Sequence, residues 1–293
     1  KKKMFELLGQ SRPMHVLELP QKPDDPDALA HWLGELVKLR AAMETMFNTQ
    51  VTDHKLREAI ALMNRERALK RDLAALMKPA NPPLTGRRLL DLKSSISGIT
   101  GDFEQYEQVL RDPLQGATAV DLSGRVRVLL TGVPTPHGAE RVVDIIEDHG
   151  GLIVCMENCT GVKPVLEDVD ARLAETDPLR AIGEKYFHLP CSVMTPNRRR
   201  LETLRDLAAE YRPQCVIDLV WQGCLTYDVE AELVKRFIEH ELGLGYLRIV
   251  TDYSPADSAR LEVRVEALFE TLQARAQARS SASRSQTATG EPK

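Results

Sequence analysis

The chain of 293 residues lacks several features that mark common classes of protein. No apolar run approaches the roughly 18 to 20 residues of a membrane-spanning helix. No cleavable signal sequence or lipidation signal is recognisable. A formal net charge of -4 leaves the chain without the basic surface on which nucleic-acid-binding proteins depend. We therefore expect a cytoplasmic protein that binds neither a membrane nor nucleic acid.

Several common site motifs are also missing. The glycine turn at residues 132–134 contains neither G-x-G-x-x-G nor G-K-[ST], so neither a dinucleotide site nor a P-loop is supported. No nucleophile elbow with a Ser/His/Asp order is found. None of the seven histidines is spaced with the cysteines as a zinc site requires.

The second half of the chain alternates short apolar runs with helical patterns. The apolar runs predict strands at residues 125–130, 152–155, 215–220 and 246–250. The helical patterns lie at residues 138–148, 198–211, 229–242 and 257–274. This alternation predicts an α/β fold with a parallel sheet of at least four strands and helices on both faces.

The first half reads differently. Residues 16–19 predict a strand, and residues 26–120 predict a mainly helical connector layer, with helices at 28–47, 52–77 and, interrupted near 94–101, at 84–110. Within that layer, Asn64 and Arg67 are interpreted as part of a solvated helix face, with contact to a site as the alternative. The polar stretch at residues 280–293 predicts a disordered tail.

The cysteines gather where the predicted strands end. Ligands of parallel α/β sheets bind outside the carboxyl ends of the strands. Cys155, Cys159 and Cys224 lie at or beyond such ends, and Cys191, after the further short run KYFHL, is expected to join them. Cys215 opens a strand and is expected to point elsewhere.

Their chemistry has two interpretations. A single strand-end cysteine is most often a small buried hydrophobic residue, and the C-x3-C spacing of Cys155 and Cys159 is a weak signal. An odd number of cysteines in an α/β chain argues against a disulfide framework. Four cysteines on one edge can converge, and iron–sulfur clusters use thiolate ligands.

The acidic, hydroxyl-rich turn at residues 251–257 is expected at the same edge. The run Arg198–Arg200 is interpreted as a solvated helix face, with anion binding as the alternative.

Six segments carry a resemblance to a known family. They are KKKMFELL from Lys1, VTDHKLREAIALMNRER from Val51, GGLIVCMENCTG from Gly150, DPLRAIGEKYFHLPCSVMTPNRRR from Asp177, WQGCLTYDVE from Trp221 and TDYSPADSARLEVRVEALFETL from Thr251. In this order they resemble the 2-hydroxyacyl-CoA dehydratase family, which also includes benzoyl-CoA reductase subunits and double-cubane cluster proteins. The resemblance covers nearly the whole chain apart from the tail.

The resemblance implies two Rossmann-like α/β domains that face each other across a cleft holding an iron–sulfur cluster, either [4Fe-4S] or double-cubane. Residues 121–279 would be the second domain and residues 1–25 a remnant of the first, whose remainder, with a further ligand cysteine, is expected ahead of the sequence given. Cys224 matches the family's late ligand cysteine. Cys159, in E-x-C-T-G, and Cys191, in P-C-x-x-T-P-N, match cysteines of the double-cubane branch, from which Leu225 departs.

The activity implied by the resemblance is that of a lyase. An electron enters the thioester of a 2-hydroxyacyl-CoA, which allows water to be eliminated. A separate ATP-dependent iron–sulfur activator protein would supply the electron, and the subunit would form a homodimer or a heterodimer with a related subunit. Two alternatives stay open: an ATP-coupled double-cubane reductase of small molecules, and a non-catalytic electron-transfer partner subunit. The chain alone, without the rest of its first domain, is expected to be inactive.

Overall fold

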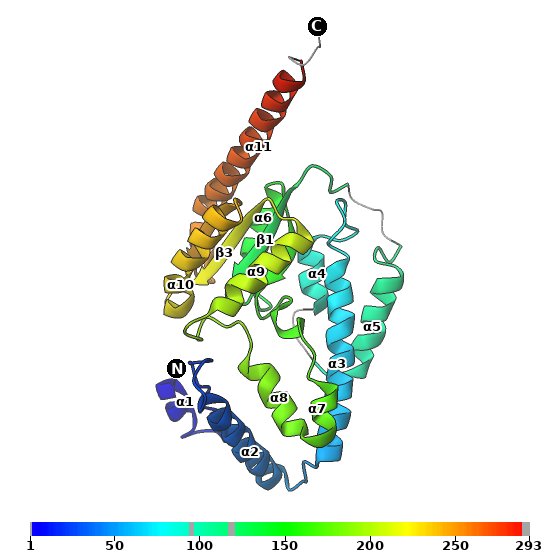
Figure 1. The fold of residues 1–293 in the computed structure, drawn as a ribbon, viewed down its shortest axis with the longest axis vertical. Helices are drawn as coiled ribbons and strands as arrows, with labels where there is room; N and C mark the ends of the chain where they lie inside the picture. Colours follow the sequence, from blue (N-terminus) through cyan, green and yellow to red (C-terminus); the bar gives the residue numbers. More distant parts are fainter. Residues whose placement is uncertain (1, 94–96, 117–120, 289–293) are drawn as a thin grey trace. The chain divides into compact units, whose positions relative to one another are not determined.

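The computed structural model describes residues 2–93, 97–116 and 121–288 (Figure 1). The chain divides into two compact units. Unit 1 draws on Lys1–Ala68 and Val165–Arg200, and unit 2 on Leu69–Pro164 and Leu201–Lys293. The domain boundaries expected from the sequence stay a prediction.

Unit 2 contains the sheet that the alternating pattern predicts. Its strands are β1 (Val126–Gly132), β2 (Gly151–Glu157), β3 (Cys215–Trp221) and β4 (Gly245–Thr251). All the neighbouring pairs are parallel, and the order is β2-β1-β3-β4. β1, β2 and β3 are buried almost throughout, as strands covered on both faces must be. The predicted α/β class, with a Rossmann-like parallel sheet, is confirmed.

The helices of unit 2 lie before, between and after the strands in the sequence. They are α4 (Gly86–Lys93), α5 (Thr100–Arg111), α6 (Arg141–Asp148), α9 (Arg198–Tyr211), α10 (Leu225–Arg236) and α11 (Ser258–Ala288), with a π-helical turn, η2 (Phe237–Glu241), after α10. Val142 and Ile146 of α6 and Leu261 and Val265 of α11 are fully buried in one cluster with Ile217 of the sheet. α6 and α11 therefore cover one face of the sheet, and their apolar positions recur at the helical period because that face excludes water.

The strand order reverses between β1 and β3. β2 lies on one side of β1 and the later strands on the other, which makes the carboxyl ends of β1 and β3 a topological switch point. Gly132 ends β1 with φ of 104°, and a Cβ there would lie 2.0 Å from the carbonyl oxygen of Leu219. Only glycine allows the two strands to approach this closely at the point where their loops diverge.

Unit 1 is helical. It contains α1 (Lys2–Leu8), α2 (Ala28–Phe47), most of α3 (Asp53–Ala75), α7 (Ala171–Thr176) and α8 (Pro178–Phe187), with the short η1 (Lys163–Val165) at its boundary. Trp32 of α2 packs against Phe187 of α8 and donates its indole N–H to the carbonyl of Gly183 at 3.0 Å. The predicted helices at residues 28–47 and 52–77 are thus confirmed nearly to their ends.

Two strand expectations in unit 1 are wrong. Residues 16–19 form no strand, and no strand lies beside them in the described part of unit 1. The run at residues 185–189 belongs largely to α8. Asp177 caps that helix by accepting from the N–H of Arg180 at 2.9 Å, and Pro178 occupies its first turn, a strong start signal that the apolar run masks.

Two predictions of solvent exposure also fail. Arg67 is 1% exposed and donates to the side chains of Asn64 at 2.8 Å and Tyr186 at 3.0 Å, while Asn64 donates to the carbonyl of Val169 at 2.9 Å. This face of α3 is covered by protein and not by water. Arg200, in the run interpreted as a solvated face, is 0% exposed.

The C-terminal helix is longer than predicted. α11 continues through Ala288, beyond the start of the tail expected at Ser280. The sequence between these residues contains no glycine or proline to end the helix. Residues 289–293 of the predicted tail lie outside the described residues. No helix in the described part of the chain combines the length and the apolar character needed to cross a bilayer.

Candidate functional site at the carboxyl edge of the sheet

Cys224 lies beyond the end of β3, at the N-cap of α10. Its N–H donates to the carbonyl of Trp221 at 2.9 Å, and its carbonyl accepts from the N–H of Asp228 at 3.0 Å. Gly223, with φ of 84°, turns the chain between strand and helix. The thiol is free and half-buried, with its sulfur 3.9 Å from the hydroxyl of Thr226.

The loop that carries Cys224 is fixed on both sides. Trp221 stacks on Tyr253 with ring centroids 4.7 Å apart, and its indole N–H donates to the carbonyl of Pro134 at 3.0 Å. The N–H of Gln222 donates to the carbonyl of Thr251 at 2.7 Å. The loops after β1, β3 and β4 are therefore joined at one edge, as predicted from their positions after strand ends.

Cys159 lies in the turn after β2. Its neighbour Asn158 is 0% exposed and donates to the carbonyl of Val133 and the hydroxyl of Thr135, both at 3.2 Å. Asn158 also accepts from the N–H of Thr160 at 3.1 Å, and the hydroxyl of Thr160 accepts from the N–H of Thr135 at 3.0 Å. The turn is anchored through its buried flanking residues, and Cys159 itself is exposed.

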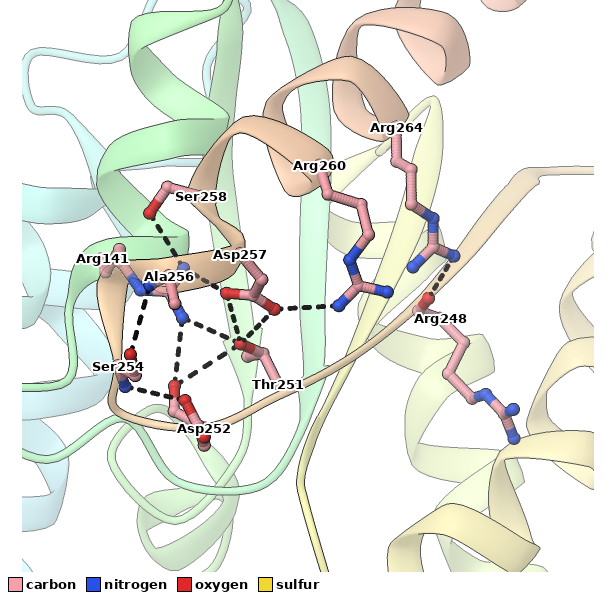
Figure 2. Close-up of polar contacts among 10 residues, drawn as sticks. All are labelled: Arg141, Arg248, Thr251, Asp252, Ser254, Ala256, Asp257, Ser258, Arg260 and Arg264. Atoms are coloured by element: carbon pink, nitrogen blue, oxygen red, sulfur yellow. Dashed lines mark hydrogen bonds and ion pairs between the residues drawn. The ribbon is translucent and has the colours of Figure 1, made fainter.

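The turn after β4 is organised by Arg141, the first residue of α6 (Figure 2). Its guanidinium donates to Asp257 at 2.8 Å, Ser258 at 3.1 Å, the hydroxyl of Thr251 at 2.8 Å and the carbonyl of Asp252 at 3.1 Å. One side chain thus ties α6, the end of β4 and the start of α11 together.

Asp257 is the anionic centre of this turn. It accepts from the hydroxyl of Thr251 at 2.9 Å and from Arg260 at 2.9 Å, in addition to Arg141 (Figure 2). Burial raises the pKa of Asp257, but the hydrogen bonds from Thr251, Arg141 and Arg260 prevail and hold that pKa below its ordinary value. A depression of about 400 Å³ lies against the turn, with Gln222 of the Cys224 loop in its lining.

The remaining cysteines differ. Cys155 and Cys215 are buried at 2% and 0% exposure, and burial raises the pKa of Cys215 to about 12. The expectation that Cys215 points away from the site is consistent with this burial. Cys191 is half-buried in unit 1 and follows α8, so it does not extend a strand of the sheet.

Within residues 2–93, 97–116 and 121–288, no three or more His, Cys, Asp or Glu side chains are grouped as a metal site would need. The three cysteines predicted as ligands, Cys159, Cys191 and Cys224, stay predictions.

Sequence reasoning missed a buried polar layer beneath the loops. Thr131, Glu157 and Asp218 pair across β1, β2 and β3, and each is 0% exposed. The hydroxyl of Thr131 donates to Glu157 at 2.5 Å, and that of Tyr246 donates to Asp218 at 2.9 Å. The signal available was a polar residue after or within three of the apolar runs: Thr131 and Glu157 follow the predicted strands at 125–130 and 152–155, and Asp218 interrupts the run at 215–220.

Comparisons with known proteins agree with the resemblance of the segments. Residues 1–272 match the family model described as 2-hydroxyglutaryl-CoA dehydratase, D-component. The chain is 36% identical over 282 residues to the putative dehydratase subunit YjiM of Escherichia coli (strain K12). The aligned residues cover 93% of this chain and 71% of that relative. It is 26% identical over 155 residues to a benzoyl-CoA reductase subunit of Thauera aromatica, which is 52% of this chain and 39% of that relative. The chain belongs to the 2-hydroxyglutaryl-CoA dehydratase D-component family.

Proposed function

We propose that this chain is an iron–sulfur subunit of a 2-hydroxyacyl-CoA dehydratase, which eliminates water from its substrate after reductive activation. The observation that carries the proposal is the free, half-buried thiol of Cys224 at the carboxyl edge of the sheet, at the start of a helix. Ligands of α/β sheets bind at this edge, next to the switch point.

The residues at this edge fit the donor set of an iron–sulfur cluster. Cys224 and Cys159 carry their thiols in loops that hydrogen bonds and a ring stack hold in place. Cys191 is a third proposed ligand, on the basis of its motif alone. A cluster bound there, [4Fe-4S] or double-cubane, would supply one-electron transfer at low potential.

The chain's own contribution is to hold the ligand loops. The stacked rings of Trp221 and Tyr253 join the Cys224 loop to the turn after β4. The hydrogen bonds of Gln222 and Asn158 fix the backbone on either side. We further propose that an ATP-dependent iron–sulfur activator supplies the electron, and that the subunit works as a homodimer or with a related subunit.

The test replaces Cys224 by alanine in the complete, anaerobically purified protein, with Cys215→Ala as the matched control. Iron and sulfide per chain, the EPR spectrum of the reduced protein and dehydration of a 2-hydroxyacyl-CoA are measured. We expect Cys224→Ala to lose iron and activity while keeping its fold, because a thiolate ligand binds iron directly. We expect Cys215→Ala to keep both and to lose about 1 kcal/mol of unfolding free energy through lost packing.

Equal iron and equal activity in the two variants would refute the cluster assignment. Loss of iron in Cys215→Ala alone would show that the ligand assignment is reversed. The similarity to a benzoyl-CoA reductase subunit favours a second candidate, an ATP-coupled reductase. Product analysis separates the two, because a reductase saturates a bond of its substrate and a dehydratase leaves its net redox state unchanged.

A further inference from the structure

A buried ion pair lies beneath the two loops that carry Cys159 and Cys224. Lys163, the first residue of η1, places its ammonium 3.0 Å from Oε1 of Glu157, the last residue of β2. The same ammonium donates to the hydroxyl of Tyr227 in α10 at 3.2 Å. The exposed fractions of Glu157, Lys163 and Tyr227 are 0%, 2% and 6%.

The placement of these residues in the sequence gives the contact its meaning. Glu157 precedes Cys159 by two positions, and Tyr227 follows Cys224 by three, in the first turn of α10. Lys163 therefore joins the backbone that leads into the Cys159 turn to the helix that begins at Cys224. The ammonium also lies 5.5 Å from the centroid of the Tyr227 ring, so the ring and the hydroxyl both hold it.

Such a bridge is a poor device for stability alone. Removing a lysine and a glutamate from water carries a desolvation penalty that their attraction offsets only when the geometry is good, and an apolar trio of similar volume is often as stable. What directed polar contacts add is a defined distance and orientation between the groups they join. A buried bridge between the segments that carry two loops would therefore fix the relative position of those loops.

We propose that Lys163 and Tyr227 are positioning residues that hold the thiols of Cys159 and Cys224 in one register for a shared ligand. The inference rests on the proposed function for the nature of that ligand, but the register itself is a property of the protein. A second link runs through a third segment: the loop after β1 contacts Asn158 through Val133 and Trp221 through Pro134. Loss of the buried bridge should thus widen the range of distances between the two thiols without releasing either loop.

The test variant is Tyr227→Phe, which removes one hydroxyl and leaves the ring and the ion pair of Lys163 in place. The matched control is Tyr246→Phe, which removes a hydroxyl that donates to Asp218 at 2.9 Å and lies 3.1 Å from the carbonyl of Ala231, also in α10. Both variants lose the same group next to the same helix, but only Tyr227 connects to the Cys159 turn.

The first readout needs no iron. Spin labels are attached to Cys159 and Cys224 of the metal-free full chain in a Cys191→Ser background, in which Cys155 and Cys215 are buried and stay unlabelled. Pulsed EPR then gives the distribution of distances between the labels. We expect a broader distribution in Tyr227→Phe and an unchanged one in Tyr246→Phe. An unchanged distribution in Tyr227→Phe would overturn the proposal.

The second readout uses the cluster-loaded protein. We expect Tyr227→Phe to broaden the EPR signal and to bind less iron per chain, with both quantities unchanged in Tyr246→Phe. If Tyr227→Phe does not fold, the double variant Glu157→Gln with Lys163→Met removes both charges together. Its label distances and its iron content then test the positioning role in the same way. Loss of iron in Cys224→Ala with unaltered label distances in Tyr227→Phe would leave the proposed function standing and refute the positioning role. Broader label distances in Tyr227→Phe together with full iron in Cys224→Ala would support the positioning role and refute the proposed function.

Discussion

Replacing Arg141 by methionine is the most informative test of how the turn after β4 is held. The change removes four hydrogen bonds, one of them to the carboxylate of Asp257, from a side chain that is 20% exposed. Net contributions of charged hydrogen bonds suggest a loss of about 2 to 3 kcal/mol, since water replaces part of what is removed. Removing a positive charge from the first turn of α6 also stabilises the protein by about 0.5 kcal/mol, because the helix dipole disfavours positive charge at that end.

The expected net loss is therefore about 2 kcal/mol of unfolding free energy, or roughly 4 to 8 °C in Tm for a unit of this size. The matched control is Arg236→Met. Arg236 pairs with Glu232 at 2.9 Å, four residues earlier in α10, with side chains 67% and 58% exposed. Exposed pairs of this kind contribute about 0.3 to 0.5 kcal/mol. Urea and thermal unfolding, followed by circular dichroism, measure both variants.

The dependence on pH gives an independent check. The hydrogen bonds hold the pKa of Asp257 below its ordinary value of 3.8 despite burial, so its carboxylate stabilises the fold above that value. This contribution is lost as the pH falls through the lower pKa of the folded state. The difference in unfolding free energy between the wild type and Arg141→Met should be constant near neutral pH and should shrink below about pH 4. Equal losses in the Arg141 and Arg236 variants, or a gap that does not narrow in acid, would refute this account.

Two further outcomes are expected from the same edge of the sheet. With a thiol reagent near neutral pH, Cys159 should react in the native protein while Cys215 reacts only on unfolding, because burial raises the pKa of Cys215 to about 12; equal rates for the two would contradict this. Gly161→Ala should lose more than about 2 kcal/mol and disorder the Cys159 turn, since a Cβ there would lie 2.0 Å from the carbonyl oxygen of Met156. Gly34→Ala, in an open part of α2, should instead gain about 0.5 to 1 kcal/mol, and a similar loss in both glycine variants would count against the steric argument.

The sheet was predictable because its signal is local. Buried parallel strands are short apolar runs, and the four runs of the second half fall on β1 to β4 with errors of one or two residues. The strand order was not predictable, because it depends on which strands pair across more than 60 residues, as β1 and β3 do. The position of the switch point therefore emerges only from the structure, whereas the place of Cys224 beyond a strand end was expected from the sequence.

The errors in unit 1 have a common cause. An apolar run of four or five residues has the same composition in a strand, an extended segment and a helix, and only its partners distinguish them. Residues 16–19 have no neighbouring strand in the described part of unit 1, and the run before Cys191 packs through α8 onto α2. Cys191 therefore follows a helix and not a strand, and its place among the ligands stays a prediction from its motif.

The burial of Arg67 and Arg200 was missed for a different reason. Charged residues on a helix are usually solvated, so a single sequence favours that interpretation. Arg67 is buried because Tyr186 and Asn64 accept its hydrogen bonds, and these partners lie 119 and three residues away. Burial of a charged side chain depends on acceptors that the pattern of one helix cannot show.

The polar row of Glu157, Thr131 and Asp218 explains why the edge of this sheet is suited to holding loops. These residues pair across three neighbouring strands, and each is completely buried. An apolar row would pack equally well but would leave the loops above it free to shift, because apolar contacts have no direction. Each polar side chain instead binds a partner from another segment: Lys163 in the case of Glu157, and Tyr246 in the case of Asp218. Only the contact of Glu157 continues, through Lys163, to Tyr227 and the loop of Cys224, whereas the bond from Tyr246 to Asp218 joins two neighbouring strands. The row therefore positions the two cysteine loops through Glu157, where an error of one ångström between two thiols would matter most.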